Sequence, residues 1–254
     1  MHPLRNAIVR WPIASYLLIA FASTWAIAPL VSVSIAFGLL ALFGPALGAL
    51  VVSWAEGTTG VLRARITDRR HPLRWYAIAF GLPFAVAAIG LLILVASGGS
   101  APGLGAISAI ELVIFVLVVG EEIGWRGFLQ PRLRERMALV PAGLATGVAW
   151  TLWHLPIYLA PSAGLAAFAT FAWWVIPLAL VMGFVADRTR SSVIIATVMH
   201  GAANIATPIL LPGVDRAWTL IITGGIYLAL VAIVAVQMAG RRRSVTGAAL
   251  AVGS

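Results

Sequence analysis

The chain has 254 residues, of which 61% are hydrophobic and only 10% are charged. Its formal net charge of +9 comes from 17 arginines and no lysine, and these arginines lie between apolar runs. Membrane topology therefore accounts for the basicity, and nucleic acid is not expected as a partner. The absence of cysteine excludes disulfide frameworks, thiol nucleophiles and thiolate zinc sites. This composition predicts a multi-pass integral membrane protein.

Eight apolar stretches approach the length of about 20 residues that a membrane-spanning helix needs. They are expected near residues 12–31, 36–55, 75–97, 108–130, 142–160, 168–186, 193–211 and 218–239. The first is predicted to be an uncleaved span, because its apolar run is too long for a typical signal peptide. The predicted fold class is all-α, a polytopic membrane bundle of about eight transmembrane helices.

The arginines fall on one side of this predicted bundle. They precede the first span and follow the second, fourth, sixth and eighth, which places 15 of the 17 on the side of the amino terminus. Cytoplasmic links are enriched in arginine, so both termini are predicted to be cytoplasmic. Residues 1–243 are expected to form a single transmembrane domain, and residues 244–254 a disordered tail.

The segment Gly120–Gly127 places three charged residues in apolar surroundings. Each would cost roughly 2.5 to 3.5 kcal/mol at the centre of a membrane helix if it were unpaired. On a helix, Glu122 and Arg126 are four residues apart and can pair, whereas Glu121 is turned by about 100° from Glu122. Glu121 is therefore the freer carboxylate. The alternative is that all three lie at a helix end and reach for water.

Two later spans also carry polar residues inside apolar sequence. His154 lies in the fifth span, and His200 and Asn204 lie four residues apart on one face of the seventh. At about 1.5 Å per residue, these three and Glu121 lie about 10 to 18 Å from the cytoplasmic end of their spans. Each residue alone could be a structural hydrogen-bonding group. Their common depth favours a shared site.

These residue types suit hydrolysis of a peptide bond. A carboxylate and an imidazole beside one water can remove its proton and direct it at a carbonyl carbon. A second imidazole and an amide can stabilise the oxyanion that forms. Glu121, His154 and His200 are also a ligand set that could bind zinc. A proton-relaying transporter is a third alternative, although no internal repeat is visible.

The three motifs resemble those of the CPBP family of intramembrane proteases, which joins type II CAAX prenyl endopeptidases with bacteriocin-processing or immunity (Abi) proteins. Glu121, Glu122 and Arg126 match the motif Glu-Glu-x-x-x-Arg, and His200 with Asn204 matches His-x-x-x-Asn. Residues 150–154 match Phe-x-x-x-His, with tryptophan in place of phenylalanine. The motif core covers residues 111–208.

The resemblance implies roles for these residues. Glu121 and His154 would activate the hydrolytic water, His200 and Asn204 would form the oxyanion site, and Glu122 and Arg126 would support the first motif. No cofactor is favoured, and zinc held by Glu121, His154 and His200 is the alternative.

The implied function is an intramembrane endopeptidase that cleaves near the cytoplasmic side of a prokaryotic cell membrane. Its expected partners are membrane lipid and a peptide or protein substrate, either lipidated or a leader peptide. The competing interpretation is a non-catalytic membrane scaffold or bacteriocin-immunity protein, in which the same polar residues form a structural network.

Overall fold

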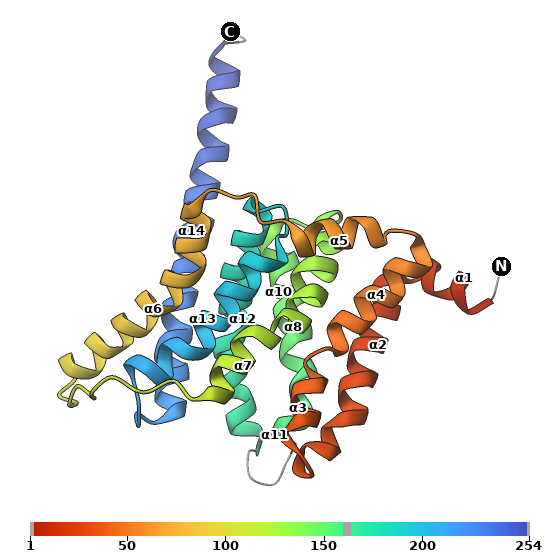
Figure 1. The fold of residues 1–254 in the computed structure, drawn as a ribbon. Coiled ribbons are helices and arrows are strands. Elements are labelled where there is room, and N and C mark those ends of the chain that lie inside the picture. Colours follow the sequence, from red (N-terminus) through yellow and green to blue (C-terminus); the bar gives the residue numbers. More distant parts are fainter. Residues whose placement is uncertain (1–2, 160–163, 253–254) are drawn as a thin grey trace.

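The computed structural model describes residues 3–159 and 164–252, and all regular elements in these ranges are helices (Figure 1). The predicted all-α fold class is therefore confirmed. The first part of the chain forms α1 (Pro3–Arg10), α2 (Pro12–Ile27), η1 (Ala28–Ser32), α3 (Ile35–Ala41), α4 (Gly44–Glu56), α5 (Thr59–Thr67) and α6 (Leu73–Ala96). The middle part forms α7 (Ala109–Leu117), α8 (Val119–Gly124), η2 (Trp125–Leu129) and α9 (Gln130–Arg134). The last part forms α10 (Leu139–Trp153), α11 (Leu155–Tyr158), α12 (Gly164–Arg188), α13 (Val193–Leu210) and α14 (Arg216–Val252).

Six helical segments in the described part of the chain are long and apolar enough to cross a membrane. They are Pro12–Ser32, Ile35–Glu56, Leu73–Ala96, Gly164–Arg188, Val193–Leu210 and Arg216–Val236. Each corresponds to one of the spans expected from sequence. The protein is thus a polytopic membrane helix bundle, whereas eight spans and cytoplasmic termini stay predictions.

The expected span at 108–130 is divided into several shorter helices. A capping box begins α7, because Ser108 and Glu111 exchange hydrogen bonds at the first turn. The helix ends at Leu117, and α8 follows with only six residues. The next five residues, η2, form a π-helical turn. Such turns insert extra backbone into a helix and often occur at functional sites.

The expected span at 142–160 is also shorter than predicted. Helix α10 ends at Trp153, and the four-residue helix α11 follows it. Residue 160 lies outside the described residues. The proline at position 156 occupies the first turn of α11, where its missing N–H is tolerated.

Helix α8 lies in the middle of the bundle, with α2 and α4 on one side and α12 and α13 on the other (Figure 1). It packs directly against α4 and α13. Gly120 and Gly124 permit a close approach to α4 and the residues before it. A Cβ at Gly124 would lie 2.8 Å from the backbone carbonyl carbon of Pro45 on α4, and one at Gly120 would lie 2.8 Å from the carbonyl oxygen of Leu42, just before α4. The two glycines therefore hold the charged motif against the core.

The other long helices enclose this centre in pairs. Helix α2 packs on α4, α13 on α6, and α12 on both α10 and α14. Helix α14 continues to Val252 and extends beyond the body of the bundle (Figure 1). Residues 244–252 are drawn within α14, and 253–254 lie outside the described residues, so the predicted tail stays a prediction. The domain boundary at 243 stays a prediction.

Candidate active site

The first motif forms a buried ion pair. Glu122 on α8 and Arg126 on η2 are both 0% exposed, and the Nη1 atom of Arg126 donates to the two carboxylate oxygens of Glu122 at 2.9 and 3.1 Å. The pairing predicted from their spacing is confirmed. Two charges removed from water require such a partner, since an isolated buried charge is strongly destabilising. The pair makes it possible for Glu122 to remain ionised in the core.

Glu122 also holds His200 of α13. The Nδ1 atom of His200 lies 2.8 Å from Oε1 of Glu122. A carboxylate can only accept a hydrogen bond, so this contact assigns a proton to Nδ1. In the neutral ring, Nε2 is then the unprotonated nitrogen. Glu122 thus fixes the ring orientation of His200, while Arg126 neutralises the carboxylate of Glu122.

Glu121 has a different partner from its neighbour. Its Oε2 atom accepts a hydrogen bond from the indole Nε1 of Trp150 on α10, at 2.7 Å. Among the described residues, no cation forms an ion pair with Glu121. The Trp150 ring also lies edge-on to His200, with centroids 4.8 Å apart, and beneath the guanidinium of Arg126 at 4.6 Å. Trp150 on α10 therefore contacts the first motif through Glu121 and Arg126 and the third motif through His200.

His154 and Asn204 complete the predicted set. The Nδ1 atom of His154 lies 2.9 Å from the carbonyl oxygen of Trp150, which can only accept, so this ring also presents Nε2 as the unprotonated nitrogen when neutral. The side-chain amide of Asn204 makes no hydrogen bond with any residue that the structure describes. Its N–H groups are therefore unengaged by the protein.

All four predicted catalytic residues line one cavity of about 650 Å³. Glu121 reaches it from α8, His154 from the junction of α10 and α11, and His200 and Asn204 from α13. Trp150 lines the same space. The residues that sequence placed at one depth thus meet in one cavity, surrounded by helices of a membrane bundle.

The cavity extends toward one end of the bundle. Its lining continues from the polar residues to Tyr158 at the end of α11, Pro212 in the link after α13, and Arg216 at the start of α14. These links are among those that the arginine distribution assigns to the outer side. The arginine-rich links lie at the opposite helix ends.

Residues 102–206 match the sequence model of the family described as type II CAAX prenyl endopeptidase Rce1-like. This range contains all three motifs. CAAX prenyl protease 2 of Methanococcus maripaludis is 26% identical over 179 residues, which cover 64% of this chain and 65% of that protein. Both matches agree with the resemblance of its three motifs to the CPBP family. The match spans slightly less than two thirds of the length of its archaeal relative.

The alternative site residues, a set of three zinc ligands, are only partly brought together by the fold. In the described residues, no three His, Cys, Asp or Glu side chains are grouped as metal ligands. The Nδ1 atoms of His154 and His200 are engaged by a carbonyl and by Glu122. The predicted ligands Glu121, His154 and His200 line one cavity but are not assembled around a common point.

Sequence reasoning missed two features of the candidate active site. It treated Trp150 as an aromatic replacement for phenylalanine, but the indole N–H makes a hydrogen bond that phenylalanine cannot make. It also assigned Glu122 only to Arg126, whereas the carboxylate binds His200 as well. Tryptophan in a motif that otherwise carries phenylalanine was the one signal available for the first feature. Nothing in the spacing indicates the second, because positions 122 and 200 are distant in the chain.

Proposed function

We propose that this protein is an intramembrane endopeptidase that hydrolyses a peptide bond with water activated by Glu121 and His154. The observation that carries the proposal is the convergence of the polar residues Glu121, His154, His200 and Asn204 on one cavity inside an apolar bundle. Intramembrane ionisable groups are costly and usually functional. The similarity to type II CAAX prenyl endopeptidases supports the same class of reaction.

In the proposed mechanism, the Glu121 carboxylate removes a proton from water as the water oxygen attacks the substrate carbonyl carbon. His154 orients this water through Nε2. The carbonyl π electrons move to oxygen, and the resulting oxyanion is stabilised by the Asn204 amide together with His200. When the C–N bond breaks, Glu121 returns its proton to the departing amine, so the carboxylate is regenerated.

His200 requires a particular protonation state for this role. A neutral ring with its proton on Nδ1, donated to Glu122, cannot donate from Nε2. A ring protonated on both nitrogens can donate to the oxyanion while its Nδ1–H stays on Glu122. Glu122 accepts the Nδ1–H and so fixes the orientation of the ring, which gives Glu122 a positioning role. Arg126 in turn holds Glu122 in place.

The proposed substrate is a peptide or protein that reaches the cavity within the membrane. The name of the archaeal relative, CAAX prenyl protease 2, favours a lipidated substrate. A leader peptide is the other class that the sequence analysis retained. The proposed location is a prokaryotic cell membrane, with which the archaeal source of that relative agrees.

The experiment compares purified wild type, Glu121→Gln and Glu135→Gln on a mixed peptide library that includes farnesylated CAAX peptides. Glu135 is exposed and lies outside the cavity, so it is the matched control. We expect cleavage by wild type and Glu135→Gln and none by Glu121→Gln, with all three proteins equally stable. Full activity of Glu121→Gln would refute the proposed base.

A strong chelator distinguishes the two chemical versions of the site. Cleavage that persists with chelator agrees with the proposed carboxylate mechanism. Chelator-sensitive cleavage that is restored by zinc would instead assign Glu121, His154 and His200 as ligands. If wild type cuts no member of the library, the result favours a non-catalytic scaffold or immunity protein, in which the same buried polar residues form a structural network and hydrolyse nothing.

The face of the membrane at which cleavage occurs depends on the orientation of the bundle. The predicted topology places the arginine-rich links in the cytoplasm, and the cavity extends toward the opposite links. With that orientation, the cavity opens on the outer side, contrary to the predicted cleavage near the cytoplasmic side. These two predictions therefore compete.

Single cysteines decide between them, because the natural chain has none. Ala64→Cys on α5 and Ala101→Cys in the link before α7 are matched exposed positions at opposite ends. With a membrane-impermeant maleimide and intact cells, the arginine distribution predicts labelling of Ala101→Cys alone. Labelling of Ala64→Cys alone would reverse the topology and place the mouth of the cavity in the cytoplasm.

A further inference from the structure

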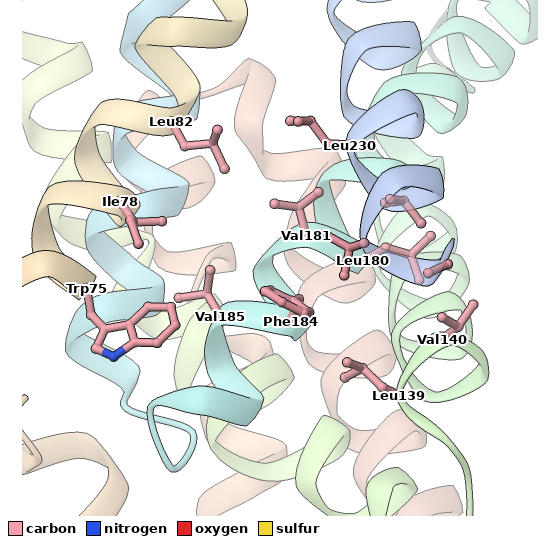
Figure 2. A pocket seen from close by; sticks show the side chains of 13 residues that line it. Trp75, Ile78, Leu82, Leu139, Val140, Leu180, Val181, Phe184, Val185 and Leu230 are labelled. Carbon is pink, nitrogen blue, oxygen red and sulfur yellow. The ribbon is translucent and has the colours of Figure 1, made fainter. Parts of the chain in front are cut away.

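A second cavity lies between α6, α10, α12 and α14, and it shares no lining residue with the candidate active site. Its volume is about 230 Å³. All 13 lining side chains are apolar or aromatic, and Figure 2 shows them arranged around an open space. The cavity lies near the starts of α6 and α10 and the end of α12, which are the helix ends next to arginine-rich links.

The chemistry of this lining selects a hydrocarbon. Apolar cavities of this kind remain dry, because a water molecule inside needs two to four polar partners. The cavity is also open at its edge: Ile78 is 38% exposed and Val140 is 44% exposed. In a membrane bundle, these exposed apolar side chains face lipid. An acyl chain can therefore enter laterally from the bilayer.

Two guanidinium groups lie at the same end of the cavity. The guanidinium of Arg188 lies 3.5 Å from the ring centroid of Phe184, and that of Arg74 lies 5.9 Å from the ring centroid of Trp75. Both rings line the cavity (Figure 2). The arginines are thus held by cation–π contacts beside an apolar space.

Neither Arg74 nor Arg188 has a carboxylate partner among the described side chains. The acidic residue next to Arg188, Asp187, is engaged by Arg134 at 2.8 Å. Each guanidinium therefore keeps its N–H donors for another anion. Arginine binds phosphate oxygens well, because its planar group presents paired donors.

We propose that this cavity binds an anionic glycerophospholipid of the surrounding bilayer, with one acyl chain in the cavity and the phosphate on Arg74 and Arg188. The charge of the two arginines complements the headgroup, and the dry lining complements the chain. A bound lipid would connect α6 to α12 and α14. Lipid that binds only the folded state would also stabilise the protein by mass action.

The binding test uses tryptophan fluorescence of the full chain in detergent. Brominated lipids quench tryptophans that they touch, and Trp75 lines the cavity. The quenching lost in Trp75→Phe measures the signal from this site. Phosphatidylglycerol with brominated chains is compared with brominated phosphatidylcholine, which has the same chains but no net charge. We expect the Trp75-dependent quenching to saturate at much lower phosphatidylglycerol.

Two kinds of variant test the two halves of the site. Arg74→Gln with Arg188→Gln removes the proposed phosphate contacts, and Arg63→Gln with Arg70→Gln removes the same charge from exposed arginines away from the cavity. A cation near an anionic membrane surface contributes roughly a fivefold factor in affinity, so the first double variant should lose roughly twenty-five-fold and the control much less. Ala235→Phe fills the cavity and should abolish the saturable quenching while both arginines remain.

Several results would overturn the proposal. Equal affinity for phosphatidylglycerol and phosphatidylcholine would remove the headgroup role of the arginines. Equal losses in the two arginine double variants would reduce the effect to net charge. Competition by a farnesylated peptide for the Trp75-dependent signal would assign the cavity to a substrate lipid instead. Unchanged quenching in Ala235→Phe would show that the acyl chain lies elsewhere.

Discussion

Replacing Trp150 by phenylalanine removes one hydrogen bond and keeps most of the aromatic packing. The lost bond is the 2.7 Å contact from the indole N–H to Glu121, and both residues are buried. Hydrogen bonds to charged groups contribute about 1.5 to 3 kcal/mol, and about 1.4 kcal/mol corresponds to a factor of ten in rate. If the bond holds Glu121 in its reactive position, Trp150→Phe should lower kcat/KM by roughly tenfold to a hundredfold.

The matched control is Trp153→Phe. Trp153 is also buried on α10, but its indole nitrogen has no hydrogen-bond partner among the described residues. Both variants are assayed for peptide cleavage and for thermal stability in detergent. We expect only Trp150→Phe to lose turnover beyond its change in stability. Equal kcat/KM in wild type and Trp150→Phe would refute the idea that the indole N–H positions the base.

Three further changes test the supporting structure. Arg126→Ala leaves Glu122 buried without its cation, so it should lower the free energy of unfolding in detergent by about 3 to 5 kcal/mol. Arg136→Ala removes an exposed arginine and should not lower it, and equal melting curves for the two variants would contradict the buried ion pair. Gly124→Ala should lower stability by about 1 to 3 kcal/mol, because the added methyl group overpacks against Tyr16. The control Gly81→Ala should be neutral or stabilising, since its added methyl group meets no atom within 4 Å. Equal stabilities of the two variants would disprove the close approach at Gly124. Asn204→Ala should lower kcat by roughly a hundredfold to a thousandfold with little change in stability, and undiminished kcat would exclude its amide as an oxyanion donor.

The pairing of Glu122 with Arg126 could be predicted because both residues belong to one short helical segment. A spacing of four residues brings two side chains onto one helix face whatever the rest of the fold does. The division of the segment into α8 and the π-helical turn η2 could not be predicted in the same way. Local spacing does not reveal how Gly120 and Gly124 bring this backbone against α4, since that contact depends on residues far away in sequence.

The number of long helices illustrates the same limit. Hydropathy identified the segments that lie in the bundle, but it assigned a continuous span to 108–130, where the chain forms shorter helices. Apolar composition does not distinguish a continuous helix from an interrupted one when both are surrounded by protein. Backbone irregularity at membrane depth is tolerated where neighbouring helices bury it.

By itself, the sequence determined the membrane class and the all-α fold, and it singled out four polar residues expected at one depth, because hydropathy and helical spacing are local properties. Only the tertiary structure decided that Trp150 binds Glu121, that Glu122 binds His200, and toward which helix ends the cavity extends. These relations join α8, α10 and α13, and their geometry follows from how the helices pack. Side chains distant in the chain acquire partners only when that packing brings them within about 3 Å of each other.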